Sequence, residues 1–409
     1  MSNDTQPEIR FPGFTDEWEQ RKLGELATIV RGASPRPIQD PKWFDTESDV
    51  GWLRIADVTE QDGRIYYLEQ HISKLGQEKT RVLVEPHLLL SIAATVGKPV
   101  VNYVKTGVHD GFLIFLNAIF DREFMFQWLE MFRPKWQKYG QPGSQVNLNS
   151  ELVRNQEILI PNNEEQQKIG SFFKQLDNTI ALHQRKLDLL KETKKGFLQK
   201  MFPKNGAKVP EIRFPGFTED WEQRKLGEVV ERVTRKNKKL ESIRPLTISA
   251  QEGLIDQNEF FNKTVASRDV SGYYLVKKGE FAYNKSYSNG YPWGAVKRLN
   301  QYDMGVLSTL YIVFKPKKID SDFLEKYYDT TYWYKEVSKH AAEGARNHGL
   351  LNIAASDFFE TEIVMPLKIE EQQKIGSFFK QLDDTIALHQ RELDVLKETK
   401  KGFLQKMFV

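Results

Sequence analysis

The chain has 409 residues, which is enough for two or three domains, and its 40% apolar content lets each domain bury a core of ordinary size. Its 59 basic and 56 acidic side chains nearly cancel, so bulk charge alone does not predict nucleic-acid binding. The absence of cysteine excludes disulfides, thiolate zinc sites and cysteine nucleophiles. No apolar run approaches the ~20 residues of a transmembrane helix, and the polar start lacks the pattern of a signal peptide. We therefore expect a soluble, cytoplasmic protein with no membrane partner.

Two segments of the chain occur twice. EIRFPGFTDEWEQRKLGE, from Glu8, returns from Glu211 with only one Asp-Glu pair in exchanged order. Residues 164–202 return at 370–408 with changes only at Asn178/Asp384, Lys186/Glu392 and Leu189/Val395. The stretches between, roughly 26–163 and 229–369, share only sparse landmarks. We interpret the repeated segments as a frame that carries two different insert domains.

Each insert is predicted to be a mixed α/β domain. In the first, β-branched and aromatic residues predict strands at 52–58, 64–68, 87–93, 98–104 and 112–116, followed by an amphipathic helix at 123–139. In the second, strands are expected at 244–249, 279–283, 293–299 and 308–314, followed by a helix at 322–341. Both inserts end with a Gly-centred polar loop, an apolar segment and a proline, Pro161 or Pro366. They are therefore expected to be diverged versions of one fold.

The repeated 39-residue segment is predicted to be a long helix of about 50 Å. Its apolar residues follow the alternating three- and four-residue spacing of a coiled-coil seam. In the first copy one row is Phe173, Ile180, Leu187 and Met201, and the other is Ile169, Leu176, Leu190 and Phe197.

Polar residues and glycines give this helix further features. His183 and Lys194 interrupt the seam, as their counterparts do in the second copy, and we interpret them as register-setting polar layers, with metal binding by the histidines as the alternative. Asn163 and Gln166 are predicted to cap the first helix. Gly170 and its repeat Gly376 predict a close approach of another backbone.

No catalytic constellation appears in the sequence. The chain has no GxxxxGK[ST] phosphate loop, no GxGxxG between a strand and a helix, and no HExxH or GxSxG motif. It also lacks the Asn-Pro-Pro-aromatic segment with which amino-methyltransferases hold a target base. We therefore expect a noncatalytic protein without a catalytic residue, metal site or cofactor.

Nucleic-acid binding has better candidates. A basic stretch follows residue 231, and two turn-rich loops of the second insert combine cations, hydroxyls, amides and aromatic rings. Loops at 91–98 and 141–145 hold the analogous places in the first insert. Such side chains can contact base edges and phosphates, although each loop alone is also compatible with an ordinary turn. The predicted DNA-binding residues are Thr95, Lys98, Ser144, Gln145, Arg235, Lys236, Lys238, Lys285, Ser288, Asn289, Tyr291, Arg346 and Asn347.

The order of insert, helix, insert, helix resembles the DNA-specificity subunit of type I restriction-modification systems. WEQRKLG at 18–24 and 221–227 carries the resemblance, together with Pro161 before EQQKI at 165–169 and Pro366 before EQQKI at 371–375. The resemblance implies an α+β fold with two mixed α/β target-recognition domains. Two long helices would join them as an antiparallel coiled coil with pseudo-twofold symmetry. The expected domains are residues 1–163, 164–202, 203–369 and 370–409.

The same resemblance implies a function. The subunit would read a bipartite site on double-stranded DNA, one half per insert, without catalysis of its own. It would direct two methyltransferase subunits and the restriction and translocase subunits. The alternatives are a coiled-coil scaffold whose inserts bind proteins and a fused nuclease-methyltransferase. Salt-dependent binding to a split DNA site separates the first reading from the scaffold, whereas cofactor binding by the isolated chain would favour the enzyme.

Overall fold

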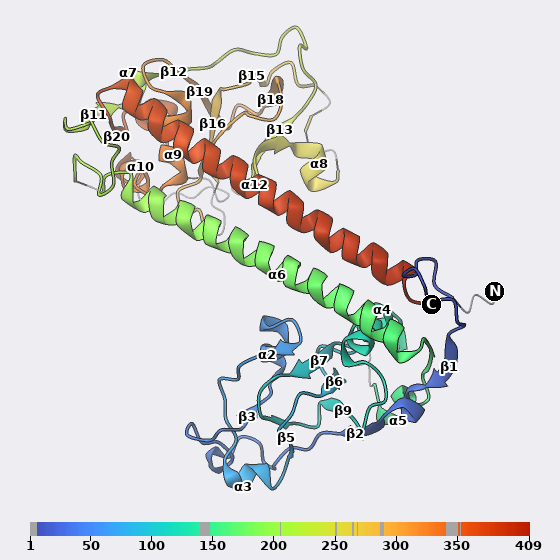
Figure 1. The fold of residues 1–409 in the computed structure, drawn as a ribbon. Helices are drawn as coiled ribbons and strands as arrows, with labels where there is room; N and C mark the ends of the chain where they lie inside the picture. Colours follow the sequence, from blue (N-terminus) through green and yellow to red (C-terminus); the bar gives the residue numbers. More distant parts are fainter. Residues whose placement is uncertain are drawn as a thin grey trace. The chain divides into compact units, whose positions relative to one another are not determined.

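The computed structural model describes residues 6–139, 148–204, 206–249, 252–263, 266–267, 269–286, 290–340, 351 and 353–409 (Figure 1). The chain forms two compact units, one of Met1–Gln184 with Arg391–Val409 and the other of Arg185–Gln390. Two long helices, α6 (Asn163–Lys200) and α12 (Ile369–Lys406), each contribute their N-terminal part to one unit and their C-terminal part to the other. No helix among the described residues is long and apolar enough to cross a membrane.

The first unit is built on a five-stranded sheet. Its order is β2 (Thr28–Arg31), β9 (Phe112–Leu116), β6 (Leu88–Ser91), β7 (Pro99–Asn102) and β4 (Arg64–Ile65), antiparallel except for the last pair. A smaller sheet contains β3 (Gly51–Trp52), β8 (Thr106–Val108) and β5 (Arg81–Leu83). Between and around the strands lie α1 (Leu23–Leu26), η1 (Pro41–Trp43), α2 (Ile55–Glu60), α3 (Lys74–Gln77), α4 (Arg122–Trp136), η2 (Gln137–Tyr139) and α5 (Ser150–Arg154).

The second unit repeats the order of the main sheet. β12 (Val230–Arg232), β19 (Ile312–Pro316), β16 (Phe281–Asn284) and β17 (Ala295–Arg298) follow one another as β2, β9, β6 and β7 do. The unit also contains the pairs β13 (Leu246–Ser249) with β14 (Gly253–Asp256) and β15 (Tyr274–Lys277) with β18 (Met304–Leu307). Its remaining helices are α7 (Leu226–Val229), α8 (Gln257–Phe261), α9 (Ser321–Asp329), α10 (Tyr334–His340) and α11 (Ala355–Phe359). The shared order confirms that the two inserts are versions of one fold.

Two sequence-based element predictions are wrong. Of residues 52–58 only Trp52 is in a strand, because α2 begins at Ile55, where the buried Asp57 carboxylate accepts a hydrogen bond from Arg54 N at 2.8 Å. The predicted helix at 322–341 is two helices, α9 and α10. The break falls at Thr330, which takes an extended conformation and donates its Oγ1 proton to Tyr327 O at 2.7 Å.

The WEQRKLG motif builds the edge of each unit. β1 (Glu19–Lys22) pairs antiparallel with β10 (Glu157–Ile160), and β11 (Glu222–Lys225) pairs in the same register with β20 (Glu362–Met365). The motif's Trp18 is buried in the core. Its Gly24 has little space, because an added Cβ would lie 3.1 Å from Arg154 Cβ. The motif therefore joins the start of each insert to its end.

The EQQ motif fastens each long helix to its insert. Gln166 Nε2 donates to Pro161 O at 2.8 Å, and its Oε1 accepts from the backbone N of Asp121, which precedes α4, at 2.9 Å. Gln372 makes the equivalent bonds to Pro366 O and Asp320 N at 2.9 and 2.8 Å.

The predicted capping box is therefore wrong. Asn163 is already helical, and Asn162 Oδ1 accepts from Glu165 N at 3.0 Å. The side chain of Gln166 accepts a hydrogen bond from the backbone N of Asp121 and therefore does not cap the start of its own helix.

The expected close approach at the repeated helical glycines is confirmed. A Cβ on Gly170 would lie 2.6 Å from Asp121 Oδ1 and 2.7 Å from Phe124 N, at the start of α4. A Cβ on Gly376 would lie 2.9 Å from Phe323 N, at the start of α9. The glycines therefore let each long helix touch the backbone of an insert helix.

We expect Gly170→Ala to destabilise the protein by about 1–3 kcal/mol, because the methyl group overlaps backbone and the capping carboxylate. The matched control is Gly196→Ala in the same helix, where no atom lies within 4 Å of the new Cβ. At that position alanine favours the helical conformation more than glycine does, so the substitution should stabilise the folded protein by up to about 1 kcal/mol. Midpoints of urea-induced unfolding measure both changes. Equal midpoints for the two variants would contradict the close packing.

Within each unit the two long helices pack antiparallel. In the first unit Phe172 and Phe403 lie 5.2 Å apart between ring centroids. In the second, the repeats exchange places, and Phe197 lies 5.1 Å from Phe378. Of the predicted seam, Ile169, Phe173, Leu187 and Met201 are buried, and the other four residues are half-buried. Ile169 and Phe173 join the core of the first unit and Met201 that of the second, so this face packs against the inserts as well.

A polar layer crosses the helix pair in each unit. Asp177 of α6 accepts from Lys400 of α12 at 2.6 Å and from Arg64 and Gln127 of the insert at 3.1 and 2.7 Å. In the second unit Asp383 has the corresponding role, contacting Lys194 at 2.7 Å and Lys326 of α9 at 2.6 Å. The layer therefore links both helices to the insert through one carboxylate.

Asp177→Asn should destabilise the protein by about 1.5–3 kcal/mol at neutral pH, because hydrogen bonds to a charged group are lost. Burial alone raises the pKa of Asp177, but Lys400 and Arg64 more than offset it and hold the pKa below its ordinary value. The stabilisation is thus complete above the unfolded pKa of about 3.9 and is lost as the pH falls through the lower folded pKa.

Asp384→Asn is the control for this change, because Asp384 is exposed and its repeat is already Asn178. Thermal unfolding of both variants between neutral and acid pH tests the assignment. The difference between Asp177→Asn and the natural chain should shrink toward acid pH, and a difference that is constant with pH would contradict the charged layer.

Candidate functional site

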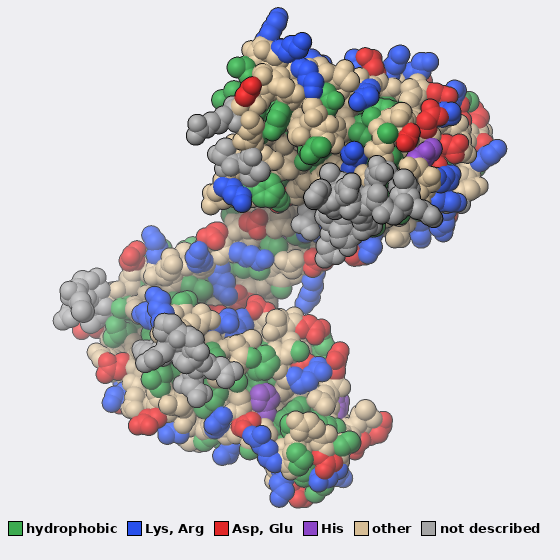
Figure 2. Space-filling view, turned by 180° about the vertical axis from the view of Figure 1, so that it is seen from behind, with side chains coloured by type: hydrophobic (Ala, Val, Ile, Leu, Met, Phe, Trp, Pro, Cys, Tyr) green, Lys and Arg blue, Asp and Glu red, His purple; other side chains and the backbone are tan. Residues whose placement is uncertain are grey.

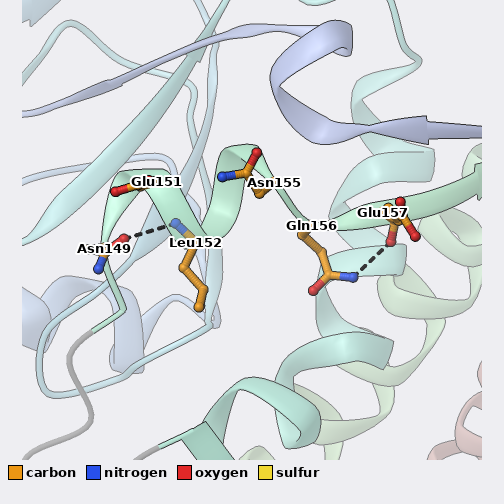
Figure 3. A pocket seen from close by; sticks show the side chains of 6 residues that line it. All are labelled: Asn149, Glu151, Leu152, Asn155, Gln156 and Glu157. Atoms are coloured by element: carbon orange, nitrogen blue, oxygen red, sulfur yellow. Dashed lines mark hydrogen bonds between the residues drawn. The ribbon is translucent and has the colours of Figure 1, made fainter.

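One described hollow of the first unit has the volume of a small-molecule pocket but not the lining of an enzyme site. This hollow has a volume of about 500 Å³ and is lined by α5 and the start of β10 (Figure 3). Two of its polar side chains serve local structure, since Asn149 Oδ1 accepts from Leu152 N at 2.9 Å and Gln156 Nε2 donates to Glu157 O at 2.8 Å. The described lining has no histidine or nucleophile, so it gives no support to a catalytic site. Its six residues are Asn149, Glu151, Leu152, Asn155, Gln156 and Glu157.

Charged side chains are mixed on the surface. On the face drawn in Figure 2, Lys and Arg are interspersed with Asp and Glu. A binding surface for an anion must therefore be identified from the partners of each cation.

The basic stretch of the second insert contains cations in two different environments. Arg235 Nη2 donates to the two carboxylate oxygens of Glu280 at 2.9 and 2.8 Å, and Glu280 is buried. Lys236 Nζ donates to Gly272 O at 2.9 Å and lies 4.2 Å from the centre of the Tyr274 ring. Both cations therefore have intramolecular partners, and for Arg235 that partner is a buried carboxylate.

Lys238 lies on a turn held by a buried asparagine. Asn237 is fully buried, and its Nδ2 donates to Ser242 O at 2.7 Å while its backbone O accepts from Leu240 N at 2.9 Å. Lys238 and Lys239 are exposed on this turn. The sequence analysis missed Asn237, although asparagine is one of the residues that favour turns.

Lys285 of the first predicted loop of the second insert contacts the segment that follows the second predicted loop, which itself lies outside the described residues. Lys285 begins the connection between β16 and β17, its backbone O accepts from Leu351 N at 2.9 Å, and its Nζ donates to Ile353 O at 3.3 Å. Tyr291, later in this connection, is half-buried and packs against the core. The predicted residues Ser288, Asn289, Arg346 and Asn347 lie outside the described residues.

The connection between β6 and β7 has the same place in the first unit. Thr95 Oγ1 donates to Ser91 Oγ at 2.9 Å. Lys98 Nζ contacts Asp62 and Glu130 at 2.5 and 2.6 Å. Burial alone lowers the pKa of Lys98, but these carboxylates more than offset it and hold the pKa above its ordinary value.

The DNA contacts of the first insert stay predictions. Lys98 is charged, but two carboxylates already neutralise it. Ser144 and Gln145 lie outside the described residues.

Comparisons with known proteins agree with this architecture. A family model described as "Type I restriction modification DNA specificity domain" matches twice, at residues 15–192 and 218–398. The MjaVIII type I restriction enzyme specificity subunit of Methanocaldococcus jannaschii is 24% identical over 97% of this chain and 92% of its own length. The putative MjaX specificity subunit of the same organism is 22% identical over 52% of each chain.

Solved structures show the same fold. The S subunit of a type I restriction-modification system from M. genitalium aligns with a TM-score of 0.60 at 13% identity, over 99% of both chains. A chain from a structure that describes complex assembly and conformational transition of a type I system aligns with a TM-score of 0.52 at 15% identity, over 98% of this chain and 99% of its own. The mixed α/β fold with two packed long helices is thereby confirmed.

Proposed function

Because the chain belongs to the family of type I restriction-modification DNA specificity subunits, we propose that it reads a bipartite site on double-stranded DNA, one half per insert domain. The observation that carries this proposal is the repeated sheet order on a repeated frame. One fold is present twice, while the connections after β6 and β16 have unrelated sequences. Two domains of the same kind with different loops suit the reading of two different half-sites.

The frame supports the proposed partners. Most exposed positions of the repeated helix are also constant between the copies, with changes only at Asn178, Lys186 and Leu189 and their repeats, although packing constrains chiefly the buried positions. Two equivalent surfaces suit two copies of one methyltransferase subunit, and the restriction and translocase subunits would join that assembly. The chain itself would bind DNA without catalysis, in the cytoplasm.

The test begins with methylation mapping in cells that carry the complete system, which identifies the DNA site. The complex of this chain with its methyltransferase subunits is then titrated with duplexes that carry both halves, one half or neither. We expect the complete site to bind most tightly and the affinity to fall steeply with salt, because phosphate contacts release counterions. Equal binding to all three duplexes would reject the proposal.

A further inference from the structure

Two arginines of the first insert contact one aspartate, and a third arginine contacts the backbone of one of them. Arg31, at the end of β2, donates from Nε to Asp110 O at 2.6 Å. Arg36 donates from Nη2 to Asp110 Oδ2 at 2.6 Å. Arg81, at the start of β5, donates from Nε to Arg31 O at 2.7 Å. Residues separated by up to 79 positions in the chain therefore form one cluster, which we call the Asp110 cluster.

The segment that carries Arg31 and Arg36 is fixed by its backbone. Gly32 N donates to Phe112 O at 2.9 Å, and Ala33 N donates to Val108 O at 3.0 Å. A side chain at position 32 has no space, because a Cβ would lie 2.1 Å from His109 O. Ser34 Oγ donates to Asp110 Oδ1 at 2.7 Å. The cluster is thus held by backbone and side-chain hydrogen bonds directly after β2.

The Asp110 cluster has an excess of positive charge on the surface. It combines three guanidinium groups with one carboxylate, and all three arginines are exposed, Arg36 with 72% of its side chain. The bonds of Arg31 and Arg81 use only Nε, and their terminal nitrogens make no hydrogen bond to any residue that the structure describes. Donors of this kind, spaced on a fixed support, suit the oxygens of phosphate groups.

The second insert has basic residues at the corresponding place. Val30 of β2 lies opposite Ile114 of β9, and Val233, directly after β12, donates to Val313 O of β19 at 2.8 Å. The chain then continues with RGASPRP in the first insert and with TRKNKK in the second. Two unrelated sequences therefore place cations after the first strand of the same sheet, and in the second insert the exposed ones are Lys238 and Lys239.

We propose that Arg31, Arg36 and Arg81 form a phosphate-binding surface by which the first insert domain holds the DNA backbone. This inference rests on the proposed function. Phosphate contacts fix the position of a protein on the duplex and carry no sequence information directly. The sequence analysis missed these residues because Arg81 and Asp110 are remote from the RGASPRP segment in the chain.

The test uses the full chain in complex with its methyltransferase subunits and the Arg36→Ala/Arg81→Ala variant. If each arginine contacts one phosphate, the slope of log affinity against log salt should fall by about 1.8, because each phosphate contributes ~0.9. Affinity should fall by the same factor for the cognate site and for duplexes altered in one base of either half. Arg36→Lys/Arg81→Lys, which retains the charges, should recover most of the slope.

The matched control is Lys42→Ala/Lys105→Ala, which removes two exposed cations of the same unit that are each paired with an aspartate, as Arg36 is. This control should keep the natural slope of log affinity against log salt. Thermal unfolding shows whether each variant is folded. A folded Arg36→Ala/Arg81→Ala variant with natural affinity and slope overturns the inference and leaves the proposed function intact. A loss confined to one DNA sequence also overturns it, because it indicates base contacts. If the natural complex itself binds no DNA, the proposed function fails instead.

Discussion

Exchanging residues 26–163 for the corresponding insert of a relative should change one half of the recognised DNA site completely and leave the other half unchanged. The physical reason is that the insert belongs to the first unit, whose sheet and core are separate from those of the second. Methylation mapping in cells that carry the complete system measures both halves at once. The reciprocal exchange of residues 229–369 should change the other half.

The frame contacts explain why such an exchange should fold. Gln166 accepts from the backbone N of Asp121, so this contact does not depend on the side chain at that position. Gly170 also meets backbone, at Phe124 N. The polar layer does need matched side chains, and the new insert should supply donors for Asp177 as Arg64 and Gln127 do. The new insert must also supply an apolar side chain in place of Phe124, whose ring centroid lies 5.3 Å from that of Phe408. Independent reading would be refuted if a folded chimera changed both halves or neither.

The sequence predicted the long helices because their pattern is local and repeated. A seam that recurs every seven residues specifies both the helix and its buried face, and the buried Phe173 and Leu187 lie on that face. The strands β6, β7 and β9 were equally evident, because they are continuous apolar runs. Helix ends were less predictable, because Gln166 bonds to Asp121 of another element instead of its own helix start.

The candidate site was harder to predict, because the availability of a cation depends on remote partners. Lys98 is neutralised in part by Glu130, and Arg235 by Glu280, 45 residues away. Neither pairing has a local sequence signal. The Asp110 cluster shows the opposite case, since its arginines became candidates only when the fold brought Asp110 to Arg36 and Arg81 to Arg31. Sequence thus identified the kind of residue, whereas the fold determines which of them are exposed.

Lengthening both long helices by four residues should lengthen the spacer between the DNA half-sites by about two base pairs. Each helix passes without interruption from one unit into the other, with the boundaries at Gln184/Arg185 and Gln390/Arg391. Four helical residues add about 6 Å, and two steps of duplex DNA at ~3.4 Å add about the same. The insertions belong after Arg185 and after Arg391, which are equivalent positions of the repeat.

Both insertions are needed because the helices pair antiparallel within each unit. Lengthening α6 alone would misalign either Phe172 with Phe403 or Phe197 with Phe378, whereas equal insertions preserve both pairs. Four residues leave a stutter in the seam, so a paired insertion of seven residues, which keeps the heptad, is the matched control. It should add about 10 Å, or about three base pairs. Methylation mapping measures the number of base pairs between the two half-sites directly. If folded variants of both lengths keep the natural spacer, the helices do not set the distance, and contacts with the partner subunits must do so.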